Sequence, residues 1–300
     1  MPELPEVETT TRGLQKEIVG LKIKDVWTDL NSKDQRQKDA VKNPKYFIYF
    51  KKEVIGKKIL SVERRAKNIL INLSAPTPSA SGHSPSDRGR KSTILIHMKM
   101  TGCLFYQKQK TGRFIHVIFT LSNGYYLAFS DVRKFGKITL LDTETRNNTK
   151  HLENIGPEPL DKTFTWQKLK ERLILKPNGK IKTVLMNPSI LAGIGNIYSD
   201  EILWRVGLHP ETLIKNIPQK KFQEIFSATQ ELLKKGINFG GDSMSDYLNI
   251  YGQKGSFQLH HEAYRRTGEK CRKKGCSGAI IRKIVNGRSA HFCNYHQINL

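Results

Sequence analysis

Residues 271–300 hold three of the four cysteines of the chain, and this placement most constrains how the chain can fold. Cys271 and Cys276 are followed, after sixteen residues, by Cys293 and His296. A tail that starts at about Gly268 is too short to bury an apolar core of its own. Three thiolates and one imidazole are enough for a closed tetrahedral zinc site. We therefore expect one structural Zn²⁺ ion to hold residues 268–300 together.

The loop between the two ligand pairs predicts a β-hairpin. The apolar run Ile280–Val285 precedes Asn286-Gly287, a typical two-residue hairpin turn, and Arg288 follows at its tip. Because an isolated hairpin is marginally stable in water, the metal would supply much of its folding free energy. Arg288 would then place a positive charge at the tip of a rigid hairpin. The alternative is that the zinc only closes the C-terminus and that Arg288 is a solvated surface charge.

The charge balance indicates a polyanionic partner. The 300 residues contain 51 Lys+Arg against 27 Asp+Glu, which gives a formal net charge of +24. Nucleic acid is the first candidate, and a membrane surface is the rival. No apolar run approaches the ~18 residues of a spanning helix, and the N-terminus lacks a signal-peptide pattern. The four cysteines could in principle pair as two disulfides. Because three of them lie close to His296 in the tail and Cys103 lies far upstream, a metal site in a reducing compartment fits better. We expect a soluble, intracellular protein.

The first half of the chain is predicted to be rich in β-strands. Short apolar segments follow one another, and Asn123-Gly124 is a hairpin signal between two of them. The segments are Tyr46–Phe50, Lys57–Val62, Asn68–Leu73, Thr93–Tyr106, Phe114–Leu121 and Tyr125–Leu141. The Ser/Pro/Gly-rich stretch Ser74–Ser92 has almost no large apolar residues, so we expect a mobile insertion there.

The second half is predicted to be mainly helical. Pro218–Lys235 carries apolar residues on one face and should end at Gly236. Lys182–Met186 and Asn196–Val206 are two further helical segments, and the loop between them contains two glycines. With Asn196 as the N-cap, this loop could cradle a phosphate, because helix N-termini attract anions. The alternative is a tight connection between helices.

The N-terminus is a candidate for covalent chemistry. If Met1 is removed, Pro2 becomes a secondary amine beside the Glu3 carboxylate. An α-amino group titrates at about 7.7–8.0, so part of it is uncharged at neutral pH and can attack carbonyl carbon. Pro5 and Glu6 suit the first turn of a helix. The alternative is an ordinary amphipathic helix with a frayed end.

Six segments of the chain together resemble the formamidopyrimidine-DNA glycosylase family, and they occur in family order over nearly the whole chain. They are Met1–Glu8, His97–Gly102, Asp131–Gly136, Gly156–Leu160, Gly193–Tyr198 and the cysteine-rich tail. The resemblance implies an α+β fold. A leading helix and an N-terminal β-sandwich would occupy residues 2–150, with the insertion at 74–92. A helical domain with a helix-two-turn-helix would occupy 151–267, and the zinc β-hairpin 268–300.

The resemblance implies a bifunctional enzyme of base-excision repair. It would remove oxidised purines such as 8-oxoguanine and formamidopyrimidines, and would then cut the strand by β,δ-elimination. Pro2 would attack the sugar C1′ and form a Schiff base, and Glu3 would act as general acid and base. Glu6 resembles a second functional glutamate that helps to order this corner. Lys67 resembles a lysine on a β-hairpin that contacts DNA near the lesion.

The resemblance also assigns DNA contacts. Lys182, Asn196 and Arg288 match three phosphate-binding positions. Met100, Arg133 and Phe135 match residues that fill the gap left by an extruded base, although the residues alone would make Met100 and Phe135 core candidates. His97 belongs to the same group of DNA-binding candidates. The lesion loop would contain Asp242, Met244, Ser245, Asp246 and Tyr247, for which a plain glycine-rich connector is the alternative.

The finger departs from the usual family pattern of four cysteines, since His296 takes the last place and the first pair has the spacing Cys-x4-Cys. Imidazole substitutes readily for thiolate, so zinc is still expected. One rival is an endonuclease VIII-like glycosylase for oxidised pyrimidines, against which Leu4 and the Arg133–Phe135 run argue. The other is a non-catalytic zinc-finger DNA-binding protein. We expect a cytoplasmic, nucleoid-associated monomer that binds double-stranded DNA with oxidised bases or abasic sites.

Overall fold

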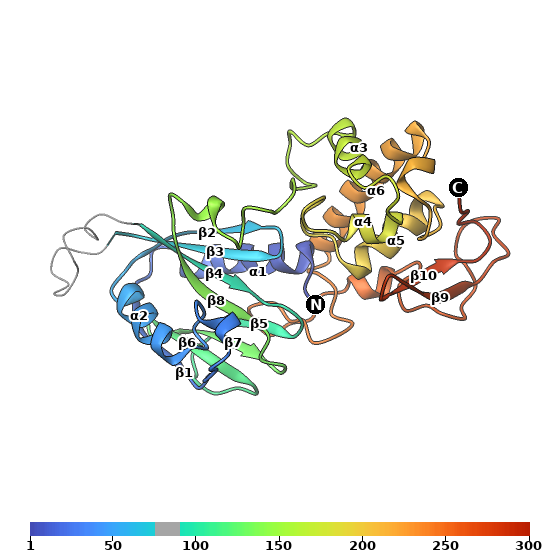
Figure 1. Cartoon of the computed structure of the whole chain (residues 1–300). Coiled ribbons are helices and arrows are strands. Elements are labelled where there is room, and N and C mark those ends of the chain that lie inside the picture. Colours follow the sequence, from blue (N-terminus) through green and yellow to red (C-terminus); the bar gives the residue numbers. More distant parts are fainter. Residues whose placement is uncertain (76–90) are drawn as a thin grey trace. The chain divides into compact units, whose positions relative to one another are not determined.

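A computed structural model describes residues 1–75 and 91–300 of the chain (Figure 1). Most of the predicted mobile insertion, residues 76–90, lies outside the described residues. The described chain divides into two compact units. The first unit contains residues 1–2, 6–153 and 240–255, and the second contains residues 3–5, 154–239 and 256–300.

The first unit is a sandwich of two four-stranded antiparallel sheets, which confirms the predicted N-terminal β-sandwich. One sheet has the order β1-β6-β7-β5, and the other has the order β2-β3-β4-β8. Apolar side chains from both sheets form one core, which includes Val117, Phe119, Ile71 and Ile96. The strands are β1 (Ile23–Thr28), β2 (Ile59–Arg65), β3 (Asn68–Leu73), β4 (Ser92–His97), β5 (Gly102–Gln107), β6 (Ile115–Leu121), β7 (Tyr126–Asp131) and β8 (Lys137–Asp142).

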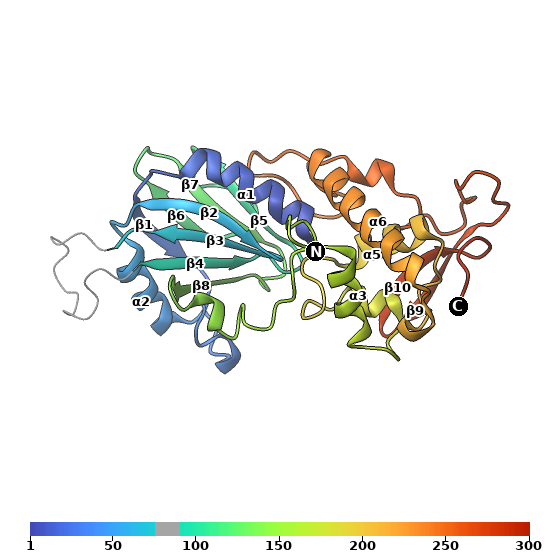
Figure 2. The same cartoon turned by 90° about the horizontal axis from the view of Figure 1, so that it is seen from above.

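The leading helix α1 spans Leu4–Ile18 and therefore begins one residue before Pro5. Val7, Leu14 and Ile18 lie in the core of the sandwich, as their helical spacing predicts. Figure 2 shows α1 beside β2, where Arg64 Nε donates to the Glu8 carboxylate at 2.7 Å.

The expected strand at Tyr46–Phe50 is wrong, because these residues lie in helix α2 (Pro44–Val54). Asn43 caps this helix by accepting a hydrogen bond from Tyr46 N at 3.1 Å, and Pro44 occupies the first turn. Phe50 and Val54 pack into the core of the sandwich. The cap and the proline are the local signals that decide between helix and strand for a short apolar run.

The second unit is built on helices, as predicted. Its helices are α3 (Trp166–Ile174), α4 (Ile181–Leu185), α5 (Asn196–Val206) and α6 (Gln219–Asn238). Helix α6 continues past Gly236, where the sequence predicts an end. Gly236 is buried against Tyr198, and a Cβ atom there would overlap the phenol, so this glycine serves close packing of α5 and α6.

The C-terminal tail forms the predicted hairpin of β9 (Ile280–Val285) and β10 (Arg288–Cys293). Asn286 and Gly287 both have positive φ angles, of 46° and 75°, as a tight hairpin turn requires. β10 lies against α5 (Figure 1). Among the described residues, no helix is long and apolar enough to cross a membrane.

Candidate functional site

Glu3 closes the N-terminus of helix α5 within the second unit. Its carboxylate accepts hydrogen bonds from Gly195 N at 2.6 Å, Ile197 N at 2.8 Å and Tyr198 N at 3.4 Å. The side chain is buried, and a Cβ atom on Gly195 would overlap the carboxylate. The N-cap residue is therefore Gly195, and Asn196 is the first helical residue rather than the cap. The Glu3 carboxylate, which is distant in the sequence, therefore caps this helix in place of the predicted Asn196 side chain.

The residues beside Glu3 are fixed as well. Leu4 N donates to Gly193 O at 3.0 Å, and the Leu4 side chain lies in the apolar core of the second unit. Gly193 has a φ of +86° and lies so close to Leu4 that a larger residue would clash. Pro2 is buried, whereas Met1 is exposed.

Glu6 anchors the predicted lesion loop within the first unit. Its carboxylate accepts from Asp242 N at 2.8 Å, and its carbonyl accepts from the Tyr247 hydroxyl at 3.0 Å. Burial raises the pKa of the Tyr247 phenol well above its ordinary value, and the Glu6 carboxylate adds to the increase. Asp242 and Tyr247 are buried, whereas Met244, Ser245 and Asp246 are exposed. Both ends of the loop are thus held near Glu6, and its middle faces solvent.

Lys67 and His97 lie near each other at one end of the β2-β3-β4-β8 sheet. Lys67 is half-buried in the turn between β2 and β3, and His97 ends β4. His97 Nδ1 accepts from Lys99 N at 3.0 Å. Burial, together with the nearby Lys99 and Lys67 ammonium groups, lowers the pKa of the His97 imidazole to about 3. His97 is therefore neutral at physiological pH, with its proton on Nε2.

Met100, Arg133 and Phe135 are all exposed, so the alternative that Met100 and Phe135 belong to the core is wrong. The Arg133 guanidinium lies over the Phe135 ring, 4.6 Å from its centroid. Thr101, the neighbour of Met100, donates to Asp131 Oδ1 at 2.5 Å and accepts from Arg133 N at 3.1 Å. The turns that carry Met100 and Arg133 are thus joined, although 32 residues separate Thr101 from Arg133.

The second unit brings Lys182, Asn196 and the start of β10 together. Lys182 Nζ lies 3.5 Å from Asn196 O, and Asn196 Nδ2 lies 3.3 Å from the hydroxyl of Ser289, the neighbour of Arg288. Arg288 is exposed at the hairpin tip and Asn196 is half-buried. Lys182 is fully buried, and its ammonium is 2.6 Å from Asp200 Oδ1. In this arrangement the Lys182 ammonium is paired with a buried carboxylate and is not exposed to solvent.

Asp200 and Glu201 are buried acids that support the candidate site and that the sequence pattern did not single out. Besides Lys182, Asp200 accepts from the backbone N–H of His291 at 3.0 Å, so it joins α4, α5 and β10. Glu201 accepts three backbone N–H groups of residues 262–264, at 2.8–3.0 Å. Burial raises the pKa of Glu201. Two adjacent acids flanked by the apolar residues Ile197, Tyr198, Ile202 and Leu203 are the signal that could have revealed these buried acceptors.

The four predicted metal ligands converge. One ligand atom from each of Cys271, Cys276, Cys293 and His296 lies within 4.8 Å of the others, which is a cluster that could hold a metal ion. His296 Nε2 lies 3.0 Å from Trp204 O, so it donates its proton there and leaves Nδ1 free of a proton, on the side of the three sulfur atoms. The donor set of three sulfurs and one nitrogen fits Zn²⁺.

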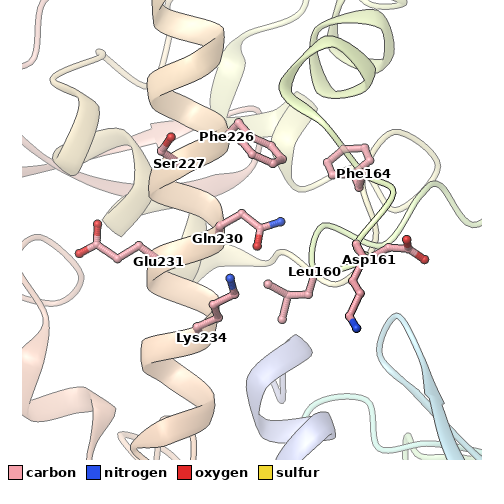
Figure 3. Close-up of a pocket in the computed structure, with 9 residues that line it drawn as sticks. Leu160, Asp161, Phe164, Phe226, Ser227, Gln230, Glu231 and Lys234 are labelled. Atoms are coloured by element: carbon pink, nitrogen blue, oxygen red, sulfur yellow. The ribbon is translucent and has the colours of Figure 1, made fainter.

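A surface pocket of about 560 Å³ lies elsewhere in the second unit (Figure 3). Leu160, Phe164, Phe226 and Gln230 are among the residues that line it. None of the predicted site residues does, so this pocket is separate from the candidate chemistry.

Comparisons with known proteins agree with this geometry. Residues 1–138 match the family model "Formamidopyrimidine-DNA glycosylase N-terminal domain", and residues 155–247 match "Formamidopyrimidine-DNA glycosylase H2TH domain". A protein of Pelotomaculum thermopropionicum named formamidopyrimidine-DNA glycosylase is 37% identical over 98% of both chains. A protein of the same name from Bacillus subtilis is 34% identical over 98% of both chains.

Solved structures of the Lactococcus lactis protein Fpg are similar over the whole fold. One, a complex with DNA that contains an abasic site, has a TM-score of 0.81 and 31% identity over 97% of both chains. Another, a mutant in complex with Fapy-dG-containing DNA, has the same TM-score and identity over 97% of this chain and 98% of the other. From these matches, the chain belongs to the formamidopyrimidine-DNA glycosylase family.

Proposed function

We propose that this protein is a bifunctional DNA glycosylase of base-excision repair that excises oxidised purines and then cuts the strand at the resulting abasic site. The observation that carries the proposal is the Glu3 carboxylate, which directly follows Pro2 and is buried at the N-terminus of the helix that presents Asn196. Pro2, the candidate nucleophile, is covalently joined to Glu3, the candidate acid–base group. The Glu3 carboxylate is hydrogen-bonded to the start of the helix that begins with Asn196, a candidate phosphate contact.

Pro2 is the proposed nucleophile after removal of Met1. The secondary amine attacks C1′ of the damaged nucleotide, the glycosidic bond breaks, and the base leaves with its bonding electron pair and a proton. The C1′–O4′ bond then breaks, the ring oxygen keeps the bonding electron pair and takes a proton relayed by Glu3, and the nitrogen lone pair joins the proline to C1′ as an iminium ion. Loss of a C2′ proton then expels the 3′ phosphate, and a second elimination expels the 5′ phosphate. An amine with a pKa of about 7.7–8.0 suits this role at neutral pH.

Glu3 is the proposed general acid and base. A group with this role must lie within hydrogen-bond reach of the proton that it transfers. Three backbone N–H groups hold the carboxylate, so its orientation is fixed before substrate arrives. Glu6 supports the same segment of chain and anchors the proposed lesion loop at Asp242 and Tyr247. The exposed middle of that loop is free to adapt to an extruded base.

The proposed phosphate contacts are Asn196 and Arg288, and both are near Ser289. A helix N-terminus and an exposed guanidinium are suitable donors for phosphate oxygens. Lys182 supports this pair through the Asn196 carbonyl, since its own ammonium is occupied by Asp200. Lys67 and the neutral His97 are the proposed contacts near the lesion.

Met100, Arg133 and Phe135 are proposed to fill the gap that an extruded base leaves. A thioether and an aromatic ring can replace lost stacking, and a guanidinium can hydrogen-bond the orphaned base on the opposite strand. The exposure of all three side chains supports this role.

One structural Zn²⁺ is proposed at Cys271, Cys276, Cys293 and His296, where it would stabilise the hairpin that carries Arg288. We further propose that the protein acts as a cytoplasmic, nucleoid-associated monomer on double-stranded DNA. Its net charge of +24 supports this proposal, because positive charge attracts the phosphate backbone.

Borohydride trapping tests the proposal. The protein is mixed with duplexes that contain 8-oxoguanine opposite cytosine, an oxidised pyrimidine, or no lesion, and the covalent adduct is measured. We expect an adduct on the 8-oxoguanine duplex that Pro2→Gly weakens, with DNA affinity largely retained. A stronger adduct on the pyrimidine duplex would favour the endonuclease VIII-like alternative. Binding without any adduct, with Met1 shown by mass spectrometry to be absent, would favour a non-catalytic binding protein.

A further inference from the structure

The turn Asp131–Gly136, which carries Arg133 and Phe135, has a backbone that needs support. Lys134 N donates to Asp131 O at 3.1 Å, and Gly136 N donates to Asp131 Oδ2 at 2.6 Å. Lys134 has a φ of +54°, a left-handed conformation that is unfavourable for a residue with a side chain. Such a conformation persists only where surrounding contacts determine it.

Thr101 supplies one such contact. Its hydroxyl donates to the buried Asp131 carboxylate and accepts from Arg133 N, so it holds the first half of the turn. Because Thr101 directly follows Met100, the same hydroxyl fixes the position of the Met100 turn relative to Arg133. The second half of the turn, at Lys134, needs a different partner.

Lys42 supplies that partner. Its ammonium donates to the Lys134 carbonyl, and the side chain is only 7% exposed although lysine is normally a surface residue. The backbone around Lys42 is itself fixed, because Val41 N donates to Ile138 O at 2.9 Å and Ser32 N donates to Lys42 O at 2.7 Å. The next residue, Asn43, caps α2. The ammonium therefore extends from a rigid base to the left-handed residue of the turn.

Electrostatics around Lys42 are consistent with this geometry. Burial lowers the pKa of the Lys42 ammonium, and the Asp131 carboxylate opposes that decrease, whereas Lys99 adds to it. The Lys42 charge is thus balanced by the carboxylate at the other end of the turn. A lysine in this position can bond the carbonyl and compensate the carboxylate at once.

We propose that Lys42 is a positioning residue, which holds the Lys134 carbonyl so that Arg133 and Phe135 are set to enter the gap left by an extruded base. This inference rests on the proposed function. It assigns Lys42 to the extrusion step and not to the covalent chemistry at Pro2. Loss of the contact should therefore slow excision of an intact lesion more than it slows reaction with a site that has already lost its base.

The test uses Lys42→Met, which keeps the length of the side chain and removes the donor. Single-turnover excision is measured on a duplex with 8-oxoguanine, and borohydride trapping is measured on the same duplex with an abasic site. Because small misplacements of positioning groups have large effects on rate, we expect excision to fall by at least about tenfold. Trapping on the abasic duplex should stay within about twofold, since that reaction needs no extrusion of a paired base.

Lys150→Met is the matched control, because it removes another lysine charge from the first unit at a side chain that is 61% exposed and paired with Asp39. It should leave both rates unchanged. Lys42→Arg, which keeps a charged donor, should recover at least part of the excision rate. If Lys42→Met does not fold, Lys42→Gln replaces it, and Thr101→Val, which breaks the other support of the turn, must show the same preferential loss.

Wild-type excision in Lys42→Met would overturn the inference, and so would an equal loss of excision and abasic-site trapping. Both outcomes differ from failure of the proposed function, in which the wild-type protein itself would give no adduct on either duplex.

Discussion

The buried ion pair between Lys182 and Asp200 allows a sharp prediction about stability. The ammonium is 0% exposed and the carboxylate 1%, and 2.6 Å separates Nζ from Oδ1. Asp200→Asn keeps the shape of the side chain and removes its charge. Lys182 would then be a buried cation without its counter-charge, with the new amide oxygen, the Ser199 hydroxyl at 3.2 Å and the Asn196 carbonyl at 3.5 Å as neutral partners.

Breaking one side of a buried pair typically costs about 3–5 kcal/mol, because the surviving charge stays desolvated. We expect Asp200→Asn to lower the free energy of unfolding by this amount. At about 2–4 °C per kcal/mol for a domain of 150–250 residues, the melting temperature should fall by roughly 6–20 °C. Adding Lys182→Met should recover part of the loss, because the double variant has no unpaired charge at this place.

Thermal unfolding followed by circular dichroism measures these effects. Glu231→Gln is the control, since it breaks the Arg205–Glu231 pair, which has the same 2.6 Å separation in the same unit but is 50% and 51% exposed. An exposed pair contributes at most about 1 kcal/mol. Equal losses in Asp200→Asn and Glu231→Gln would refute the argument from burial, and so would a double variant whose loss is the sum of the two single losses.

Three further predictions concern DNA binding, the metal and pH. Arg288→Ala should reduce the salt slope of DNA binding by about one phosphate contact. Lys182→Met should leave the slope unchanged, because the Lys182 ammonium is paired with Asp200. A reduced slope in Lys182→Met would mean that the wild-type ammonium leaves Asp200 to bind phosphate. Removal of zinc by a chelator should unfold the β9–β10 hairpin and weaken DNA binding, as followed by hydrogen exchange of residues 268–300, and unchanged protection there would contradict a structural metal. The pKa of His97 is lowered from 6.5 to about 3 in the folded protein. As the pH falls from 6.5 towards 3, His97 therefore takes up a proton in the unfolded chain but not in the folded protein, so the fold should become less stable. At pH 5 this amounts to about 2 kcal/mol, from about 1.4 kcal/mol per pH unit, and His97→Gln should show a correspondingly smaller decrease in urea unfolding.

Local signals in the sequence were sufficient where a short segment determines its own conformation. The β9–β10 hairpin was predicted because Asn286 and Gly287 tolerate positive φ angles, and the metal cluster because its ligands are close in sequence. The error at Tyr46–Phe50 has the same origin, since a short apolar run fits a strand or a helix equally well. Asn43 and Pro44, which lie just before that run, contain the information that decides for the helix.

Interactions between distant residues could not be predicted in this way. Nothing near Lys182 in the sequence indicates that its ammonium is buried, because its partner Asp200 is 18 residues away and is itself fixed by His291 on the hairpin. Nothing near Asn196 indicates that Glu3, 192 residues from Gly195, caps its helix. Buried polar groups are decided by which elements pack together, and that depends on the tertiary fold.

The two glutamates of the N-terminal segment affect how any experiment on catalysis must be interpreted. Glu3 holds the first turn of α5 in the second unit, and Glu6 holds the loop at Asp242 in the first unit, each through backbone N–H groups. Glu3→Gln would place an amide NH₂, which cannot accept, at one of two oxygen positions that now accept from N–H groups. The variant would therefore disturb the helix start that presents Asn196 as well as remove an acid–base group. Loss of activity in Glu3→Gln measures acid–base catalysis only if binding to abasic-site DNA, and its salt slope, stay at the wild-type level.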